Sequence, residues 1–300
     1  MTPDAPSATR VDARAAARAL ARLARAAEPP WLHQEAARRM AERLGWIKAR
    51  PAQVLDWSGA AGASSDLLAA AYPRATQLRV DETPPSGPRG AAVPWWRRWS
   101  SAAAAPRRVR PGEVQPASAG LVWSNMRLHF EPDPEPLLRA WRTALAPEGF
   151  LMFSTLGPGS LALLREVHEE AGWGPAHAPF VDMHDLGDML AAHGFAEPVM
   201  DQETLNLSYA SPDALLGELR ALGANLAPKR FAGLRTRRWH DALRARLAER
   251  AASDGRLTLQ VELVYGHAFR AADAGPRVEP QTTIELSDMK LMLRKEQSRK

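Results

Sequence analysis

Short segments made almost entirely of apolar residues recur along this chain, and they restrict its fold more than any other feature. The segments 119–123 (AGLVW) and 150–154 (FLMFS) are apolar at nearly every position. A strand has this composition when both faces of its sheet are covered, as in a parallel sheet. A third segment, 53–57 (QVLDW), stops at a loop of small residues over 58–63. The pattern predicts an α/β fold.

The residues after this loop complete a βαβ unit. A helix is expected over 65–72 and a second strand over 77–80, which ends at Asp81. A strand, tight loop, helix and strand in this order form a crossover that is almost always right-handed. Upstream, apolar residues recur at steps of four between Leu32 and Leu44, which predicts a helix with one apolar stripe.

The rest of the chain predicts further elements and a helical insertion. The expected helices lie over 136–145 and 182–193, and the expected strands over 198–209 and 257–269. A mostly helical stretch at about 211–252 suits an insertion over the sheet edge. The expected organisation is a flexible N-terminal segment with an exposed helix over 1–30, one main domain over 31–270, and a loosely held polar tail over 271–300.

The composition excludes several kinds of chemistry. The chain has no cysteine, so it has no disulfide framework, thiolate metal site or cysteine nucleophile, which fits a reducing cytoplasm. Its formal net charge is +5, and a positive surface attracts acidic partners at long range. An Arg-rich sequence also arises from genome base composition alone, so both interpretations stay open. No apolar run reaches the ~20 residues that span a bilayer, so we expect no membrane segment.

Two polar motifs have simple structural interpretations. Asp182, His184, Asp185 and Asp188 suggest a metal cluster, but Asp182 and Asp185 have the spacing of a helix cap and its return partner. We therefore expect no metal site. The segment 157–160 (GPGS) lacks the Lys-Ser/Thr ending of a P-loop and predicts a turn.

A tryptophan cluster, Trp95, Trp96 and Trp99 around two arginines, favours packing against the sheet edge over stacking on a nucleobase. The spacing of serine, histidine and aspartate along the sequence does not indicate a Ser-His-Asp triad, which argues against a hydrolase. We expect neither a nucleic acid nor a membrane as partner.

Four stretches, taken together, are typical of one family. They are 54–56 (VLD) with its loop, 121–130 (LVWSNMRLHF), 145–161 (LAPEGFLMFSTLGPGSL) and 219–225 (LRALGAN). With them the chain resembles the class I methyltransferases, and more closely the malonyl-[acyl-carrier protein] O-methyltransferases of biotin synthesis. The resemblance implies a Rossmann-like, seven-stranded, mostly parallel sheet with helices on both faces. It also implies S-adenosylmethionine at the carboxyl ends of the strands, where open α/β sheets generally bind ligands.

The resemblance assigns residues to this cofactor. The loop from Ser58 to Gly62 passes under the methionine part, and Asp81 accepts hydrogen bonds from the ribose hydroxyls. Ser124 and Asn125 lie near the methionyl end. The implied cofactor residues are Asp56, Ser58, Gly59, Ala60, Gly62, Asp81 and Ser124.

The implied acceptor is the free carboxylate of a malonyl thioester on an acidic acyl-carrier protein. A carboxylate is already ionised near neutral pH, so methyl transfer needs positioned groups rather than a strong general base. His129, Asn125 and Arg127 are the implied catalytic residues, although a lone histidine is about as often structural. Arg127, Lys229 and Arg230 are candidates for a cation that binds an acceptor oxygen. A basic surface suits the carrier protein, and we expect a monomer in the cytoplasm.

The cofactor loop departs from the pattern of the family, which carries glycine at three alternate positions because the bent backbone leaves no room for Cβ. Here these positions hold Ser58, Ala60 and Gly62, with Gly59 as another source of the unusual torsion. Glu113 is the nearest match to the acidic residue expected after the third strand. Three functions stay open: the implied carboxyl O-methyltransferase, a methyltransferase with another acceptor, and a catalytically degenerate module that binds or regulates.

Overall fold

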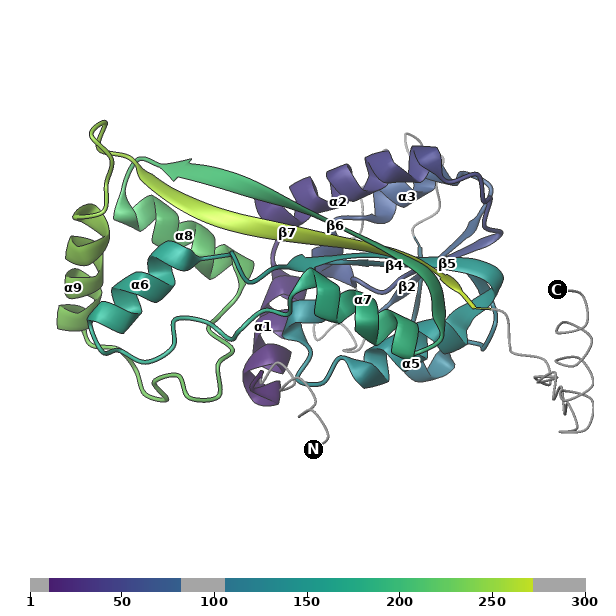
Figure 1. Ribbon diagram of the computed structural model, residues 1–300, viewed down its shortest axis with the longest axis horizontal. Helices are drawn as coiled ribbons and strands as arrows, with labels where there is room; N and C mark the ends of the chain where they lie inside the picture. The colour runs from purple at the N-terminus through teal and green to yellow at the C-terminus, as the bar shows by residue number, and fades with distance from the viewer. Residues whose placement is uncertain (1–10, 82–105, 272–300) are drawn as a thin grey trace, which may run out of the picture.

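The computed structural model describes residues 11–81 and 106–271, which form one seven-stranded sheet (Figure 1). The strands are β1 (Gln53–Asp56), β2 (Thr76–Val80), β3 (Arg107–Val109), β4 (Ala119–Asn125), β5 (Leu145–Leu156), β6 (Phe195–Tyr209) and β7 (Leu257–Arg270). They lie in the order β3-β2-β1-β4-β5-β7-β6. The first five run parallel, whereas β7 is antiparallel to both β5 and β6. The predicted Rossmann-like, mostly parallel sheet is confirmed.

Helices cover both faces of the sheet. They are α1 (Ala13–Arg25), α2 (Trp31–Arg43), α3 (Ser65–Ala71), α5 (Glu135–Ala144), α6 (Ala162–Glu170), α7 (Met183–Ala192), α8 (Pro212–Leu222) and α9 (Arg237–Ala248). α2 and α3 pack on one face, and α5 and α7 on the other (Figure 1). Neighbouring residues of a central strand enter opposite cores, as Val54 joins the α2 side and Leu55 the α5 side. This alternation explains why the central strands are apolar throughout.

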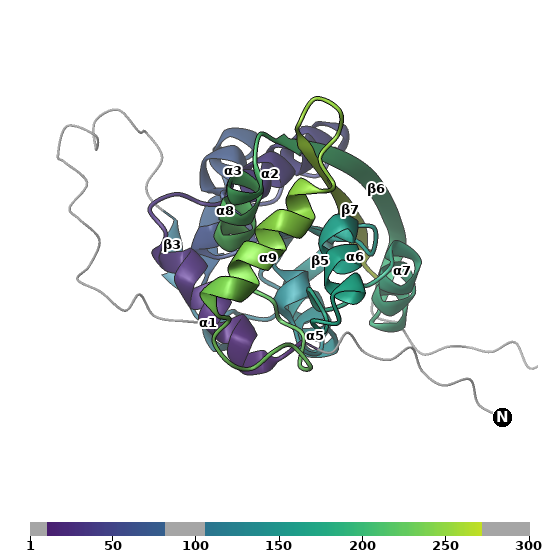
Figure 2. The same cartoon turned by 90° about the vertical axis from the view of Figure 1, so that its left-hand side faces the viewer.

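The outer strands β6 and β7 carry the helical insertion at one end of the molecule. They pair along their whole length, from Phe195 with Arg270 to Tyr209 with Leu257. The first half of β7 is buried against α8 and α9, where Leu259 shares a core with Leu215, Leu243 and Leu247. Figure 2 faces this end, with α6, α8 and α9 toward the viewer. β3 and α6 have no counterpart among the predicted elements; β3 is only three residues long, too short for a legible pattern.

Helix α1 is not simply exposed, as the sequence suggested. Three alanines and one leucine make a buried face: Ala15, Ala16, Ala19 and Leu23. This face packs against Ala61 in the loop after β1 and against Leu226 after α8. Asp12 caps the helix by accepting a hydrogen bond from the Ala15 amide at 2.9 Å. α1 therefore bridges the cofactor loop and the insertion, because small side chains let the backbones approach closely. The tryptophans at 95, 96 and 99 lie outside the described residues.

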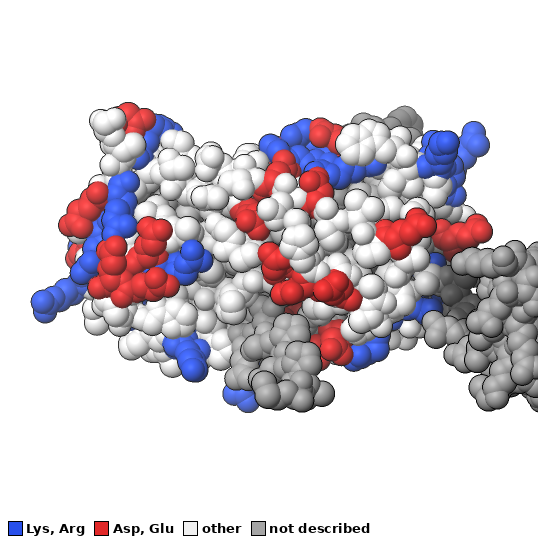
Figure 3. Space-filling model, in the orientation of Figure 1, with Lys and Arg blue, Asp and Glu red and all other residues white. Residues whose placement is uncertain are grey.

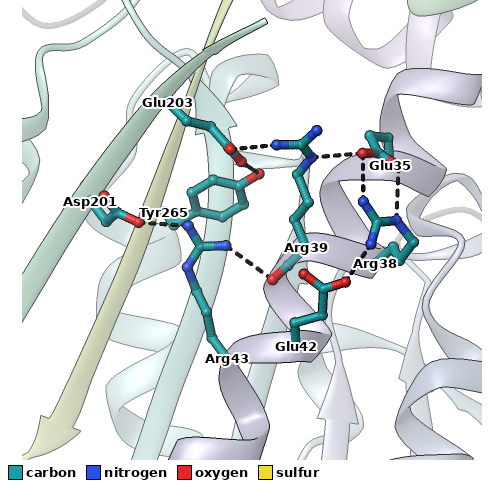
Figure 4. A network of polar contacts seen from close by, with 8 residues as sticks. All are labelled: Glu35, Arg38, Arg39, Glu42, Arg43, Asp201, Glu203 and Tyr265. Atoms are coloured by element: carbon teal, nitrogen blue, oxygen red, sulfur yellow. Dashed lines mark hydrogen bonds and ion pairs between the residues drawn. The ribbon is translucent and has the colours of Figure 1, made fainter.

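Ion pairs join α2 to β6, and a cation–π contact joins it to β7 (Figure 4). Arg39 bonds Glu35 on its own helix at 2.7 Å and Glu203 of β6 at 2.5 Å. Arg43 pairs with Asp201, also at 2.5 Å, and its guanidinium lies 3.9 Å from the ring centre of Tyr265. Burial and the nearby Glu203 carboxylate raise the pKa of Tyr265. These contacts hold the α2 side of the sheet in place at some distance from the strand ends that form the site.

Candidate active site

Three predicted site residues lie at the ends of adjacent parallel strands. Asp56 ends β1, Asp81 directly follows β2 and Asn125 ends β4. Parallel strands present their carboxyl ends at one edge of the sheet, where open α/β sheets bind ligands. The loop after β1 passes over this edge. The structure therefore brings the predicted cofactor residues of β1, β2 and β4 together.

Gly59 supplies the backbone conformation that the loop requires. Its φ is +67°, in the left-handed region that favours glycine. A Cβ at this position would lie 3.2 Å from Oδ1 of Asp81, so the loop backbone passes close to that carboxylate. The short 3-10 turn Ala60–Gly62 follows; the side chain of Ala60 is not among the described features. Gly59, which stands between two of the positions where the family carries glycine, allows the bend.

The Ser58 side chain is buried beneath the loop. Its Oγ accepts a hydrogen bond from the backbone amide of Asn125 at 2.6 Å, and its own amide donates to Asp56 Oδ1 at 3.0 Å. Gly62 lies directly against it, since a Cβ on Gly62 would approach Ser58 Cβ to 2.1 Å. The hydroxyl thus joins the loop to β4, and the pair Ser58 and Gly62 fits only while residue 62 has no side chain.

Asn125 is the central connector of this region. Its Nδ2 donates to the carbonyl oxygens of His33 and Gly62, both at 2.7 Å. Its Oδ1 accepts from the hydroxyl of Ser154 on β5 at 2.6 Å. The side chain is 1% exposed, and these bonds join α2, the loop and two strands. Its polar atoms are thus all engaged within the protein, so the structure places it in support of the loop.

Buried polar atoms beside the loop offer binding capacity for a ligand. Asp56 Oδ2, Trp57 Nε1 and Ser124 Oγ have no hydrogen-bond partner among the described residues. Burial raises the pKa of Asp56 to about 6. A buried carboxylate oxygen without a partner is costly, and a cationic ammonium or a bridging water would satisfy it. Together with the close approach at Gly59, these atoms fit an amino-acid-bearing nucleoside such as S-adenosylmethionine.

Asp81 is held by two arginines. Its Oδ2 lies 3.3 Å from Arg79 Nε and 3.7 Å from Arg108 Nε. Its Oδ1 faces the Gly59 backbone. The carboxylate therefore keeps one oxygen beside the loop, which suits an acceptor of hydroxyl hydrogen bonds. Glu113 is exposed instead, and its side chain accepts a hydrogen bond from the amide of Arg110 at 2.8 Å.

A cavity of about 130 Å³ lies near the loop, separated from it by side chains that pack around Ala61. It is lined by segments far apart in sequence: His129 and Phe130 after β4, Leu156 and Leu161 around the end of β5, and 219–226 at the end of α8. Phe130, with Ala178 and Leu226, also packs around Ala61 of the loop. Three of the four stretches that resemble the methyltransferase family therefore meet at one cavity. The turn predicted at 157–160 lies between two of the lining leucines, and Ser160 donates its amide to Gly157 at 3.0 Å.

His129 is the predicted catalytic residue that lines this cavity. Its ring lies edge-on to Phe180, with 6.2 Å between the ring centres, and its Nδ1 is 3.4 Å from Thr155 Oγ1. Burial, helped by nearby His33, lowers the pKa of His129 to about 3. The imidazole is neutral near pH 7, so it offers one N–H donor and no positive charge.

The three candidate cations do not line the cavity. Arg127 is 6% exposed and pairs with Glu131. Arg230 bonds Asp12 and the Ala227 carbonyl oxygen, both at 2.8 Å. Lys229 is exposed. Among the described residues that line the cavity there is no lysine or arginine.

Two lining residues were not assigned a role from sequence. His177 stacks on Phe180 with 4.9 Å between ring centres, and its Nε2 has no partner among the described residues. Its Nδ1 is 2.7 Å from the Ala178 carbonyl oxygen, so this nitrogen carries the proton. Asn225 donates to the Pro175 carbonyl oxygen at 2.7 Å and so holds the segment before His177. Asn225 belongs to a family-like stretch; His177 stands alone in a Gly- and Pro-rich segment without a sequence signal.

Metal binding finds no support in the part of the chain that the structure describes. No group of three or more His, Cys, Asp or Glu residues is placed there to hold an ion. Asp182 instead caps α7 by accepting from the His184 amide at 2.8 Å, which confirms the capping interpretation. Within the same residues, every helix is too short or too polar to cross a lipid bilayer.

Comparison with curated proteins gives close relatives of one kind, although no family model matches the chain. The malonyl-[acyl-carrier protein] O-methyltransferase of Laribacter hongkongensis is 38% identical over 253 residues, which cover 82% of this chain and 84% of the relative. The enzyme of the same name from Gallionella capsiferriformans is 36% identical, with 82% and 86% covered.

Comparison with solved structures supports the fold. The YcgJ protein of Bacillus subtilis matches with a TM-score of 0.52 at 12% identity, covering 79% of this chain and 99% of that one. A putative methyltransferase of Bacillus halodurans gives a TM-score of 0.50 at 13% identity, covering 79% and 100%. Identities this low speak to the fold alone, and the family follows from the curated relatives. This chain belongs to the malonyl-[acyl-carrier protein] O-methyltransferase family of S-adenosylmethionine-dependent enzymes.

Proposed function

We propose that this protein transfers the methyl group of S-adenosylmethionine to the free carboxylate of malonyl-[acyl-carrier protein], a step of biotin synthesis. The names of the curated relatives supply this substrate. The observation in this molecule that supports it most is the meeting of the family-like stretches at one cavity beside the cofactor loop. We further propose that the protein acts as a monomer in the cytoplasm.

The chain's contribution to cofactor binding is a rigid cradle. When bound, S-adenosylmethionine supplies an electrophilic methyl group on a sulfonium centre. In this proposal Asp56 binds the amino-acid end, directly or through water, and Asp81 accepts hydrogen bonds from the ribose hydroxyls. Gly59 lets the loop backbone approach the ligand, while Ser58 and Asn125 hold the loop in position from beneath. Ser124 keeps a hydroxyl available at the end of β4.

The acceptor is placed in the apolar cavity, with its carboxylate toward the loop. A carbon–oxygen bond forms as the carbon–sulfur bond of the donor breaks, and no proton moves, because the carboxylate is ionised before it binds. An apolar wall removes water from the nucleophile, and the product is a neutral ester that suits the same wall. His129 orients the acceptor by donating its N–H. Since this imidazole is neutral, it does not repel a sulfonium.

The first experiment measures cofactor binding and turnover separately. Calorimetric titration with S-adenosylhomocysteine is expected to give a 1:1 complex, and methyl transfer is followed with labelled S-adenosylmethionine and malonyl-[acyl-carrier protein]. Absence of binding at millimolar ligand contradicts the enzyme proposal and favours a degenerate module. Binding without transfer to the malonyl carrier favours a different acceptor.

Growth of a biotin-requiring strain that lacks its own methyltransferase provides the second test. Expression of this chain is expected to restore growth without biotin. A variant with Asp81→Ala is the matched control, since it keeps the fold but removes the carboxylate assigned to the ribose. Equal growth with this variant contradicts the assignment of Asp81.

A further inference from the structure

One side of helix α1 is a row of exposed arginines. Arg14, Arg18, Arg22 and Arg25 follow at spacings of four, four and three residues, so they lie along one face of the helix. The opposite face is the buried one that packs on the cofactor loop. The acidic residue nearest to the start of the helix, Asp12, is already paired with Arg230 at 2.8 Å. Within residues 11–81 and 106–271, these four arginines have no acidic partner, so α1 presents positive charge to solvent.

A second basic surface lies in the hollow between α8 and α9. It is lined by Arg220, Arg237, His240, Asp241 and Arg244. The two acidic residues at this hollow both pair with Arg244, Asp213 at 2.7 Å and Asp241 at 3.3 Å. Arg220 and Arg237 are exposed, and the described residues provide neither with an acidic partner. The hollow thus keeps a net positive charge of its own.

These two surfaces are in contact, and they meet at the rim of the cavity. Arg22 of α1 donates to the carbonyl oxygens of Arg220, at 3.4 Å, and of Gly223. The next residue, Ala224, is the one exposed residue among those described that line the cavity. The cavity therefore reaches the surface where the α1 row meets the α8–α9 hollow. α8 itself links both, because Leu219 and Leu222 line the cavity while Arg220 lines the hollow.

The other approach to the cavity carries charges of both signs. A groove of about 570 Å³ beside α6 shares Ala176, His177 and Phe180 with the cavity. Arg165 and Glu169 both line this groove, and acidic side chains gather over α6 (Figure 3). Glu166 and Glu170 of the same helix pair with Arg250. This approach therefore lacks the excess of positive charge that attracts an acidic protein to the α1 side.

We infer that the continuous basic surface formed by the outer face of α1 and the α8–α9 hollow, here called the α1–α8–α9 face, is the docking surface for the acidic carrier protein. The carrier binds through Arg14, Arg18, Arg220 and Arg237, and its thioester arm enters the cavity past Ala224. Arg22 serves a different purpose, holding α1 against α8. This inference rests on the proposed function for the identity of the partner, and it adds the place and the charge that recognise it.

The test reverses two charges on this surface and compares two acceptors. The variant is Arg18→Glu with Arg220→Glu; the matched control is Arg74→Glu with Arg139→Glu, two exposed arginines elsewhere on the molecule. Methyl transfer is measured with malonyl-[acyl-carrier protein] and with malonyl-pantetheine, which has the reacting group but no carrier. The docking variant is expected to raise KM for the carrier about tenfold or more, an effect of about 1.4 kcal/mol, while kcat/KM for malonyl-pantetheine stays unchanged. Raising the salt concentration is expected to reduce the difference in KM for the carrier between the docking variant and the unmodified protein.

Three results overturn the inference: an unchanged KM for the carrier, an equal rise in the control variant, or an equal loss with both acceptors in the docking variant alone. Failure of the proposed function looks different, because the unmodified protein then methylates neither acceptor. A fluorescence-anisotropy titration of labelled holo-carrier protein gives a readout without turnover. Binding is expected to weaken only in the docking variant.

Discussion

The loop after β1 and the cavity under α8 share Phe130, Ala178 and Leu226 as neighbours, yet different kinds of interaction hold them together. Directional contacts close the loop, where Asn125 joins Ser58, Gly62 and Ser154 by buried hydrogen bonds of 2.6 to 2.7 Å. The cavity wall consists mostly of leucine, alanine and phenylalanine, whose packing is non-directional. Losing one partner of a buried hydrogen bond leaves polar groups unpaired, whereas an apolar wall tolerates changes of similar volume. The loop thus depends on the geometry of its hydrogen bonds, and the cavity depends on the volume of its wall residues.

Asn125→Leu is the substitution expected to have the largest effect on the loop. The substitution keeps the size of the side chain but leaves the carbonyls of His33 and Gly62 and the Ser154 hydroxyl without their partner. The free energy of unfolding, measured with urea, is expected to fall by about 3 kcal/mol. Asn206→Leu on exposed β6 is the control, with a change within about 0.5 kcal/mol. A loss in Asn125→Leu as small as that in the control contradicts the connector role.

Gly62→Ala tests the fit between the loop and Ser58. The added Cβ collides with Ser58 Cβ, and the free energy of unfolding is expected to fall by about 2 kcal/mol. In a Ser58→Gly background the same substitution is expected to cost much less, because the colliding atom is gone. Gly112→Ala, where nothing lies within 4 Å, serves as control. If Gly62→Ala lowers the free energy of unfolding equally in both backgrounds, the strain does not come from the Ser58 side chain.

Ala176→Leu sharpens the comparison from the acceptor side. Ala176 is 8% exposed and lines the cavity, so a larger apolar side chain reduces the space for the acceptor. KM for malonyl-[acyl-carrier protein] is expected to rise about tenfold, or about 1.4 kcal/mol, with the affinity for S-adenosylhomocysteine unchanged. Ala70→Leu on the exposed side of α3 is the control. A parallel loss of affinity for S-adenosylhomocysteine shows that the two regions are not independent.

The smallest expected effect concerns pH and His129. Burial keeps its folded-state pKa at about 3, below the usual 6.5, so the unfolded chain binds a proton that the folded chain does not. Stability contributed by the neutral imidazole is present above pH 6.5 and is lost as the pH falls toward the folded-state value. Between pH 7.5 and 5.5, His129→Gln is expected to lose about 1 kcal/mol less stability than the unmodified protein. Urea unfolding at both pH values measures this, and identical losses contradict a neutral buried His129. Buried His33, whose pKa is lowered to about 4, contributes in the same direction, and Asp56 opposes it because its pKa is raised to about 6.

The fold was predicted correctly where the apolar pattern of a short segment indicates that the segment is buried. The apolar segments at 119–123 and 150–154 became central strands because both of their faces are covered. The exposed helix expected near the N-terminus was wrong in one respect. Its alanines are weakly hydrophobic in any scan of the sequence, and only contact with Ala61 and Leu226 makes them a core. Three-residue β3 was missed because its hydrogen bonds to β2, rather than its composition, make it a strand.

The site residues divide in the same way. Asp56, Gly59 and Asp81 were assigned from the family resemblance, and they lie together because parallel strands end at one edge of the sheet. The roles of Ser58 and Asn125 were not legible, since the sequence cannot tell whether a side chain points to a ligand or beneath the loop. Arg127, Lys229 and Arg230 were chosen by charge alone, and charge does not report direction. His177 lacked a motif and joined the site only through the folding of the chain around Phe180.

The apolar strands, the turn after Asp56 and the family-like stretches were all contained in the sequence, because each depends on residues close together along the chain. The cavity, the path of Ser58 beneath the loop and the joining of α1 to α8 were decided by the tertiary structure. Each of these brings together residues about sixty or more positions apart, such as Ser58 with Asn125 and Arg22 with Gly223. Contacts of that kind are selected by the packing of the whole domain, so no local pattern records them.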